Sequence, residues 1–149
     1  MVLIYKGPIH VDNLLSRWYN AEHNKNYGAM VSFVGTIREE GGIEALSFDI
    51  YRPILDQWFE GWKKRLEAKG AIIAMAHSEG DVPVHKSSFT CAIFSRKRRV
   101  ALEMLDAFVE DFKANAPIWK YDVINDKRVY AKDRSTPMAG SGILMLDDK

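Results

Sequence analysis

Apolar residues recur at helical spacing in three segments of the chain. The first runs from residue 11 to about residue 23, and the second occupies residues 53–69, with Pro53 in its first turn and Gly70 as its stop. The third opens with residues 96–99 and must end before Pro117, because proline disfavours helical geometry in the residues before it. The pattern therefore predicts three amphipathic helices.

Six other segments are rich in β-branched and aromatic residues, which is typical of strands. They are residues 29–36, 43–51, 71–76, 87–94, 119–124 and 128–131. We expect the first two to pair as a hairpin around residues 39–42, and the last two to close around Asn125 and Asp126. Because helices and strands are interspersed and at least one hairpin is expected, the pattern favours an α+β sandwich over a purely parallel sheet.

Composition narrows the range of functions. The 149 residues are 47% hydrophobic, which suits one domain with a sizeable core. The net charge of +1 argues against a protein-wide surface for nucleic acid. Cys91 is the single cysteine, and no apolar run reaches the roughly 20 residues of a membrane helix. We therefore expect a cytoplasmic protein without a membrane segment.

Cations gather at three junctions between the predicted elements. Residues 96–99, Arg-Lys-Arg-Arg, stand at a helix N-terminus, where the helix dipole disfavours positive charge. An anionic ligand such as a phosphate would offset this repulsion, although the four side chains would also be accommodated by solvation and by pairing with carboxylates. Arg38 follows a predicted strand, and Lys120 and Lys127 follow Pro117. We infer a single anionic site from these cations, with solvated surface lysines as the alternative.

Three sequence segments carry a resemblance to a known family. They are Gly-Ala-Met-Val-Ser-Phe-Val-Gly-Thr-Ile-Arg at 28–38, Tyr-Arg-Pro at 51–53 and Ala-Pro-Ile-Trp-Lys at 116–120. Together with the element order, they resemble the large, catalytic subunit of molybdopterin synthase over residues 1–135. The resemblance implies one catalytic domain, 1–135, with an α/β-hammerhead-like sandwich of antiparallel strands and about three helices. Residues 136–149 form a tail to which we assign no function.

The resemblance also implies a reaction. The family takes sulfur from the thiocarboxylated C-terminal glycine of a small ubiquitin-like subunit and adds it to cyclic pyranopterin monophosphate, which forms the dithiolene of molybdopterin. The implied assembly is a homodimer within a heterotetramer. We expect no cofactor beyond the sulfur of the partner. No histidine pair has metal-ligand spacing, so we expect no protein-bound metal either.

Roles for individual residues follow from the family motifs. Lys120 matches the family's lysine after tryptophan, and Lys127 matches a second lysine seven positions later. A lysine among other cations loses its proton more easily, so we expect Lys120 to act as acid or base, with Lys127 supporting it. Neither lysine alone distinguishes itself from a solvated surface residue.

Four further residues are expected to bind anionic substrate groups. Arg38 and Arg98 match family arginines, and guanidinium groups suit bidentate contacts to phosphate or carboxylate. Lys97 stands where the family often has histidine, which removes any imidazole-based proton transfer at that position. Arg134 is the expected equivalent of an arginine that reaches the site across a dimer interface.

His77 and Trp119 are two further candidates for the site. His77 follows an apolar strand, and we expect a hydrogen-bonded structural histidine there, with a place at the site as the alternative. Trp119, beside Lys120, is expected either in the core or in the pocket wall.

Two other functions stay open on the sequence alone. A non-catalytic adaptor would bind the glycine tail of a ubiquitin-like protein through the same cations without transferring sulfur. A nucleic-acid-binding module would use residues 96–99 together with Lys120, Lys127 and Arg128 as a phosphate-tracking patch. The balanced charge weighs against the second alternative.

Overall fold

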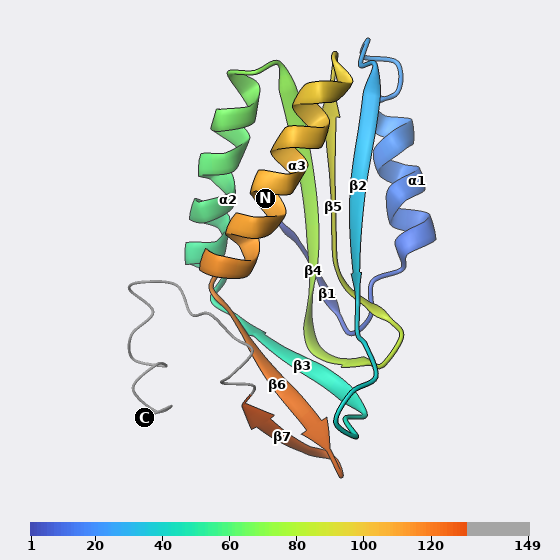
Figure 1. The fold of residues 1–149 in the computed structure, drawn as a ribbon, viewed down its shortest axis with the longest axis vertical. Coiled ribbons are helices and arrows are strands. Elements are labelled where there is room, and N and C mark those ends of the chain that lie inside the picture. Colours follow the sequence, from blue (N-terminus) through green and yellow to red (C-terminus); the bar gives the residue numbers. More distant parts are fainter. Residues whose placement is uncertain (131–149) are drawn as a thin grey trace.

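The structure, a computed structural model, describes residues 1–130 of the chain (Figure 1). The boundary expected at residue 135, the tail 136–149 and Arg134 lie outside the described residues. The elements, in chain order, are β1 (Leu3–Lys6), α1 (Val11–Glu22), β2 (Ala29–Thr36), β3 (Ala45–Ile50), α2 (Arg52–Glu67), β4 (Ala71–Pro83), β5 (Ser87–Ser95), α3 (Arg98–Asn115), β6 (Ile118–Ile124) and β7 (Lys127–Tyr130). The expected α+β class, single domain and three helices are confirmed.

The seven strands form one sheet in the order β2-β5-β4-β3-β6-β7, with β1 beside β4. All neighbours are antiparallel except β1 and β4, which are parallel. The 13-residue strand β4 holds the sheet together, because its first half pairs with β5 and its last residues pair with β3. As a result, β3, β6 and β7 extend the sheet at one end of the β2-β5-β4 layer (Figure 1).

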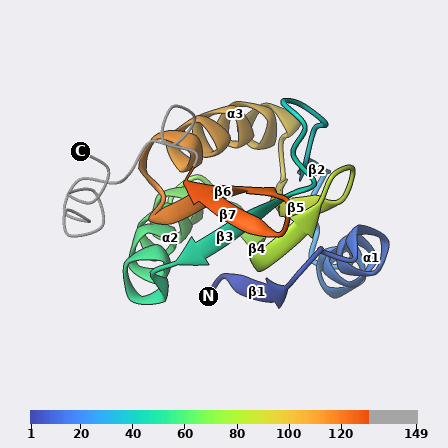
Figure 2. The ribbon, with the colours of Figure 1, turned by 90° about the horizontal axis from the view of Figure 1, so that it is seen from below.

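Helices cover both faces of this layer. Helices α2 and α3 pack on one face, and α1 packs on the other (Figure 2). The larger core lies under α2 and α3, where Phe59 and Phe108 meet the β4 and β5 side chains Met75 and Ile93. Leu14 of α1 packs on the opposite face. The helical spacing of apolar residues in the sequence corresponds to this burial, because each helix packs one apolar face against the sheet.

The expected hairpin between residues 29–36 and 43–51 is wrong. Strand β2 pairs along its length with β5, whereas β3 pairs with β4 and β6. Both strands have β-forming residues, but strand propensity carries no information about which edge of a sheet a strand joins. The loop after β2 therefore crosses from one edge of the sheet to its extension and carries Arg38 with it.

One strand boundary and one additional strand also differ from expectation. The strand predicted over residues 71–76 is longer in the structure, because β4 continues through Gly80, which adopts φ +85°, to Pro83. Strand β1 was not predicted at all, since its four residues are too few to show periodicity. The β6–β7 hairpin is confirmed, and its turn residues Asn125 and Asp126 have positive φ values of 52° and 61°. This left-handed geometry is typical of a tight hairpin turn.

Candidate active site

A cavity of about 220 Å³ lies where the end of β2, the sheet extension and the end of α3 meet. Its lining residues are Phe33, Gly35, Thr36, Ile37, Arg38, Glu40, Leu46, Phe48, His77, Ser88, Phe89, Phe112, Lys113, Ala116, Ile118 and Lys120. The lining is apolar around Phe48, Phe89 and Phe112 and carries three cationic side chains. Such a combination accommodates an apolar or aromatic body with an anionic group attached.

Strand pairing places Lys120 in the cavity. Lys120 on β6 lies directly opposite Phe48 on β3, and directly opposed residues project to the same face of a sheet. Both side chains line the cavity, and Lys120 is half-buried. Trp119, the preceding residue, projects to the other face and is 3% exposed, so its core placement is confirmed. Because side chains alternate between the two faces along β6, Lys120 lies in the cavity and Trp119 lies in the core.

Arg38 reaches the same cavity from the loop after β2. The preceding residue, Ile37, is anchored to the β4–β5 turn: its N–H donates to the Lys86 carbonyl at 2.9 Å, and its own carbonyl accepts from the His85 N–H at 2.7 Å. The Arg38 side chain itself is exposed and lies 3.6 Å from the Glu40 carboxylate. The backbone thus fixes the position of the arginine, while its guanidinium remains accessible to an anion.

Lys113 is a third cation at the cavity, and sequence reasoning missed it. It lies in the last turn of α3, whose C-terminal end, with Phe112 and Ala116, forms one wall. The signal was present in the sequence, since Lys113 stands seven residues before Lys120 across the Pro117 break. The chain reverses direction between α3 and β6, and this reversal brings the two lysines to the same cavity.

His77 forms part of the cavity floor. It lies on β4 opposite Phe89 of β5, and its ring is 5.0 Å from the Phe48 ring and 5.6 Å from the Phe112 ring. Burial lowers the pKa of His77 from 6.5 to about 4, although the hydrogen bond to the Ser78 carbonyl acts in the opposite direction. The imidazole is therefore neutral near pH 7. Both sequence interpretations of His77 hold, since it is hydrogen-bonded, buried and at the site.

Lys127 lies on the same sheet face as Lys120 but farther along it. Lys127 pairs with Ile124 of β6. Ile124 and Lys120 are four positions apart on that strand, so their side chains project to the same face of the sheet. The spacing of four residues corresponds to about 13 Å along the strand. Lys127 does not line the cavity, so within the described residues only a ligand that extends out of the cavity would meet both lysines.

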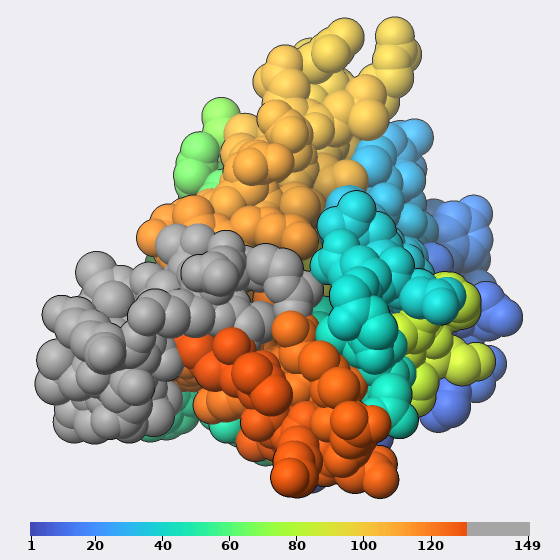
Figure 3. Space-filling view, turned by 60° about the horizontal axis from the view of Figure 1, so that its bottom comes forward, coloured from blue at the N-terminus to red at the C-terminus, as the bar shows by residue number. Residues whose placement is uncertain are grey.

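Lys97 and Arg98 are not brought to this cavity in one chain. Arg98 begins the 18-residue helix α3, and the cavity lies at the other end of that helix, about 27 Å away by helical rise. Figure 3 shows the yellow start of α3 at the opposite end of the molecule from the orange strands β6 and β7. The three cationic junctions thus form two separate groups in the described part of the chain.

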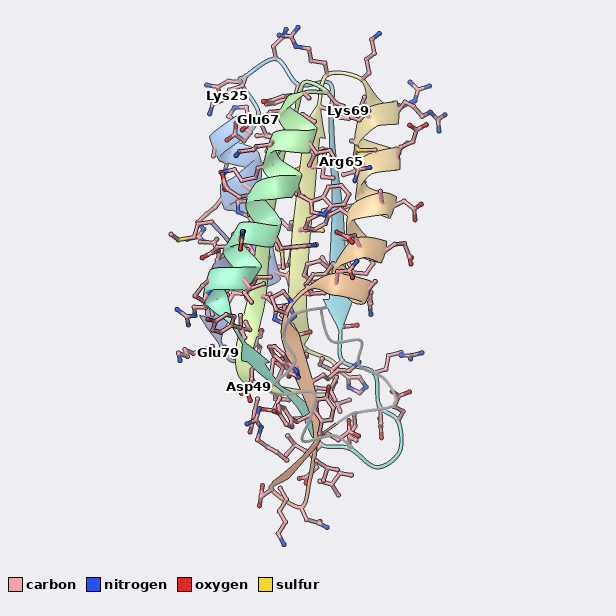
Figure 4. The ribbon with its side chains drawn as sticks, turned by 90° about the vertical axis from the view of Figure 1, so that its left-hand side faces the viewer. Lys25, Asp49, Arg65, Glu67, Lys69 and Glu79 are labelled. Carbon is pink, nitrogen blue, oxygen red and sulfur yellow. The ribbon has the colours of Figure 1, made fainter. Side chains whose placement is uncertain are left out.

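The separation also bears on the nucleic-acid alternative. Residues 96–99 are at one end of the molecule, and Arg128 is on the sheet face opposite Lys127, ion-paired with Asp49 at 2.9 Å. Figure 4 shows Asp49 on that lower part of the sheet, near Glu79. These cations therefore do not form the continuous patch that tracking a phosphate backbone requires.

Several other features complete the description. Among residues 1–130 there is no group of three or more His, Cys, Asp or Glu side chains that could hold a metal ion. The Cys91 thiol is buried, and burial raises its pKa to about 12, which excludes a thiolate at neutral pH. Within the same residues, no helix has the length and apolar character to cross a membrane.

The fold and the cavity define an α+β protein with a partly apolar cavity that is lined by three cationic side chains. Residues 4–115 match the family described as MoaE protein. The molybdopterin synthase catalytic subunit of Helicobacter pylori strain 26695 is 47% identical over 97% of this chain and 99% of the relative. That of Dictyostelium discoideum is 31% identical over 75% of both chains. The chain belongs to the MoaE family of molybdopterin synthase catalytic subunits.

Solved structures agree with this assignment. The complex of subunits 1 and 2 of molybdopterin-converting factor from Helicobacter pylori contains a chain that is 47% identical, with a TM-score of 0.90 over 96% of this chain and 98% of that one. Molybdopterin synthase from Staphylococcus aureus has the same fold, with a TM-score of 0.74 at 24% identity over 87% of this chain and 95% of that one. The resemblance noted in the sequence is thereby confirmed.

Proposed function

We infer that the chain is the sulfurtransferase subunit of molybdopterin synthase and acts in molybdenum cofactor biosynthesis. It transfers sulfur from the thiocarboxylated C-terminal glycine of a small ubiquitin-like subunit to cyclic pyranopterin monophosphate. The observation that carries this proposal is the joint placement of Lys120 and Arg38 at one partly apolar cavity, in a chain that matches molybdopterin synthase catalytic subunits along almost its whole length.

The cavity chemistry suits this substrate pair. The phosphate and the thiocarboxylate are both anions, and Arg38, Lys113 and Lys120 place three donors around the space where the anions would meet. Opening of the cyclic phosphate requires proton transfer, and we assign that role to Lys120 because it is half-buried in the cavity wall. Arg38 and Lys113 bind the phosphate, and Lys127 supports the approach of the second anion along the same sheet face.

The partner follows from the solved relative. The Helicobacter pylori protein was solved as a complex of subunits 1 and 2, and we propose the corresponding small subunit as the partner of this chain. Its glycine tail must reach Lys120, so it has to enter the cavity between the β2–β3 loop and the end of α3. We also propose a heterotetramer with two copies of each subunit, located in the cytoplasm, where Cys91 would stay reduced.

Single-turnover conversion of cyclic pyranopterin monophosphate by the purified chain, with thiocarboxylated small subunit, tests the proposal. We expect the dithiolene product with the wild-type chain and at least a hundredfold slower formation with Lys120→Ala. Lys69→Ala is the matched control, because Lys69 is exposed in the turn that follows the C-terminal end of α2 (Figure 4). A wild-type chain that binds the small subunit but forms no product would instead identify the non-catalytic adaptor.

A further inference from the structure

His77 is the polar member of an otherwise apolar row of β4 side chains. Ile73 and Met75 precede it at alternate positions and belong to the core under α2 and α3. His77 continues that row into the cavity floor and is 2% exposed. An apolar side chain would satisfy packing at this position, so the presence of an imidazole needs another explanation.

The hydrogen bonding of the imidazole leaves one nitrogen available. His77 Nδ1 lies 2.7 Å from the Ser78 carbonyl oxygen, which can only accept, so Nδ1 carries the proton. In the neutral ring Nε2 is then a lone-pair acceptor. Nε2 has no hydrogen-bond partner among residues 1–130, and the ring forms part of the cavity wall. This acceptor therefore belongs to a ring that lines the cavity, where a ligand donor can reach it.

The position of this acceptor differs from that of the cations. Arg38 and Lys113 are exposed at the cavity mouth and can only donate, which suits a phosphate. His77 lies deeper, with its ring 5.0 Å from the Phe48 ring and 6.0 Å from the Phe89 ring, so a heterocycle beside the imidazole would contact an aromatic wall. A phosphate offers no donor to Nε2 in this apolar floor, whereas a reduced nitrogen heterocycle carries N–H groups.

We propose that His77 is a substrate-binding residue that accepts, at Nε2, a hydrogen bond from a ring N–H or amino group of the heterocycle and so orients it below the phosphate. The proposal rests on the proposed function and adds the residue that recognises the heterocyclic part of the substrate. It assigns the two ends of the ligand to two parts of the cavity: the phosphate to the cations at the mouth, the ring to His77 at the floor.

The test measures the dissociation constant of cyclic pyranopterin monophosphate for the full chain. His77→Phe keeps an aromatic ring of similar size but removes the acceptor, and we expect it to weaken binding about tenfold. His77→Gln places an amide oxygen near the Nε2 position and should restore binding to within about threefold of wild type. Ser78→Ala is the control, since Ser78 is equally buried on the same strand, its hydroxyl has no partner and its carbonyl is retained.

The outcomes separate binding from structure. Wild-type affinity in a folded His77→Phe would overturn the proposal, as would an equal loss in His77→Phe and His77→Gln. If His77→Phe fails to fold, His77→Asn, which keeps the donor to the Ser78 carbonyl but is too short to reach the ligand, must show the tenfold loss. A wild-type chain that does not bind cyclic pyranopterin monophosphate would overturn the proposed function itself. Unchanged affinity for the small subunit in all variants is expected throughout.

Discussion

The indole N–H of Trp62 on α2 donates to the Asp111 carboxylate on α3, with 2.7 Å between Nε1 and Oδ2. Trp58, one turn earlier on α2, donates to the same oxygen at 2.9 Å, and Asn115 donates to the other oxygen at 2.6 Å. Arg65 stacks on the Trp62 ring at 4.4 Å and lies on α2 beside α3 (Figure 4). This carboxylate thus ties α2 to α3 immediately above the α3 turn that forms the cavity wall.

Removal of this carboxylate should destabilise the fold. We expect Asp111→Ala to lower the free energy of unfolding by about 1–3 kcal/mol, because two partly buried indole donors lose their acceptor. Urea unfolding followed by tryptophan fluorescence measures the change. Glu110→Ala, at the exposed neighbouring position, should have an effect within about 0.5 kcal/mol of zero. Equal effects of the two substitutions would contradict the structural role of Asp111.

The same carboxylate gives a pH dependence. Burial raises the pKa of Asp111, but the hydrogen bonds from Trp62, Asn115 and Trp58 outweigh it and hold the pKa below the ordinary value of 3.8. The contribution of Asp111 is therefore present above pH 3.8 and is lost as the pH falls through the lower, folded-state value. The stability difference between wild type and Asp111→Ala should shrink in that acidic range and stay constant between pH 5 and pH 8.

The lowered pKa of His77 predicts a second loss of stability at acidic pH, in the same direction as that of Asp111 but at higher pH. Its folded-state pKa of about 4 lies below the ordinary value of 6.5, so the unfolded chain binds a proton that the folded chain does not between these values. Wild-type stability should thus fall by up to about 3 kcal/mol as the pH drops from 6.5 to 4. His77→Phe should remove this part of the slope, because the exposed histidines are common to both proteins. If the free energy of unfolding of the two proteins changed equally with pH over this range, His77 would not be a neutral, buried imidazole.

Arg38 and Lys120, the two sequence-predicted cations that line the cavity, should have different kinetic effects when substituted. We expect Arg38→Ala to raise KM for the pterin substrate about tenfold with a smaller change in kcat, because Arg38 binds the phosphate before and during reaction. Lys120→Ala should lower kcat at least a hundredfold, since proton transfer is needed only in the transition state. Steady-state kinetics with saturating thiocarboxylated small subunit separates the two effects. A purely KM effect of Lys120→Ala would remove its assignment as acid or base.

Arg98 can contribute to catalysis only in the cavity of a second copy. One chain places Arg98 about 27 Å from its own cavity, the length of helix α3. If Arg98 binds substrate there, mixing two inactive variants, Arg98→Ala and Lys120→Ala, should restore activity, since a mixed dimer contains one cavity with both residues intact. Each variant mixed with itself is the control. No recovery in a mixture shown to form mixed dimers would remove Arg98 from the substrate-binding set.

The sequence determined the local structure of this protein. The three helices and the β6–β7 hairpin follow from apolar periodicity, Pro117 and the Asn125–Asp126 turn, which act over a few residues. The segments 28–38, 51–53 and 116–120 together with the element order indicated the family, because these short residue patterns are specific in combination. These features need no knowledge of which segments meet in space.

Tertiary structure decided what the local patterns could not. The pairing of β2 with β5 rather than β3, the extension of β4 to Pro83 and the short strand β1 depend on contacts between distant segments. The same contacts bring Lys113 and His77 to Lys120 and keep Arg98 away from it within one chain. Sequence spacing measures separation along the chain, whereas a site is defined by separation in space, which only strand order and helix packing fix.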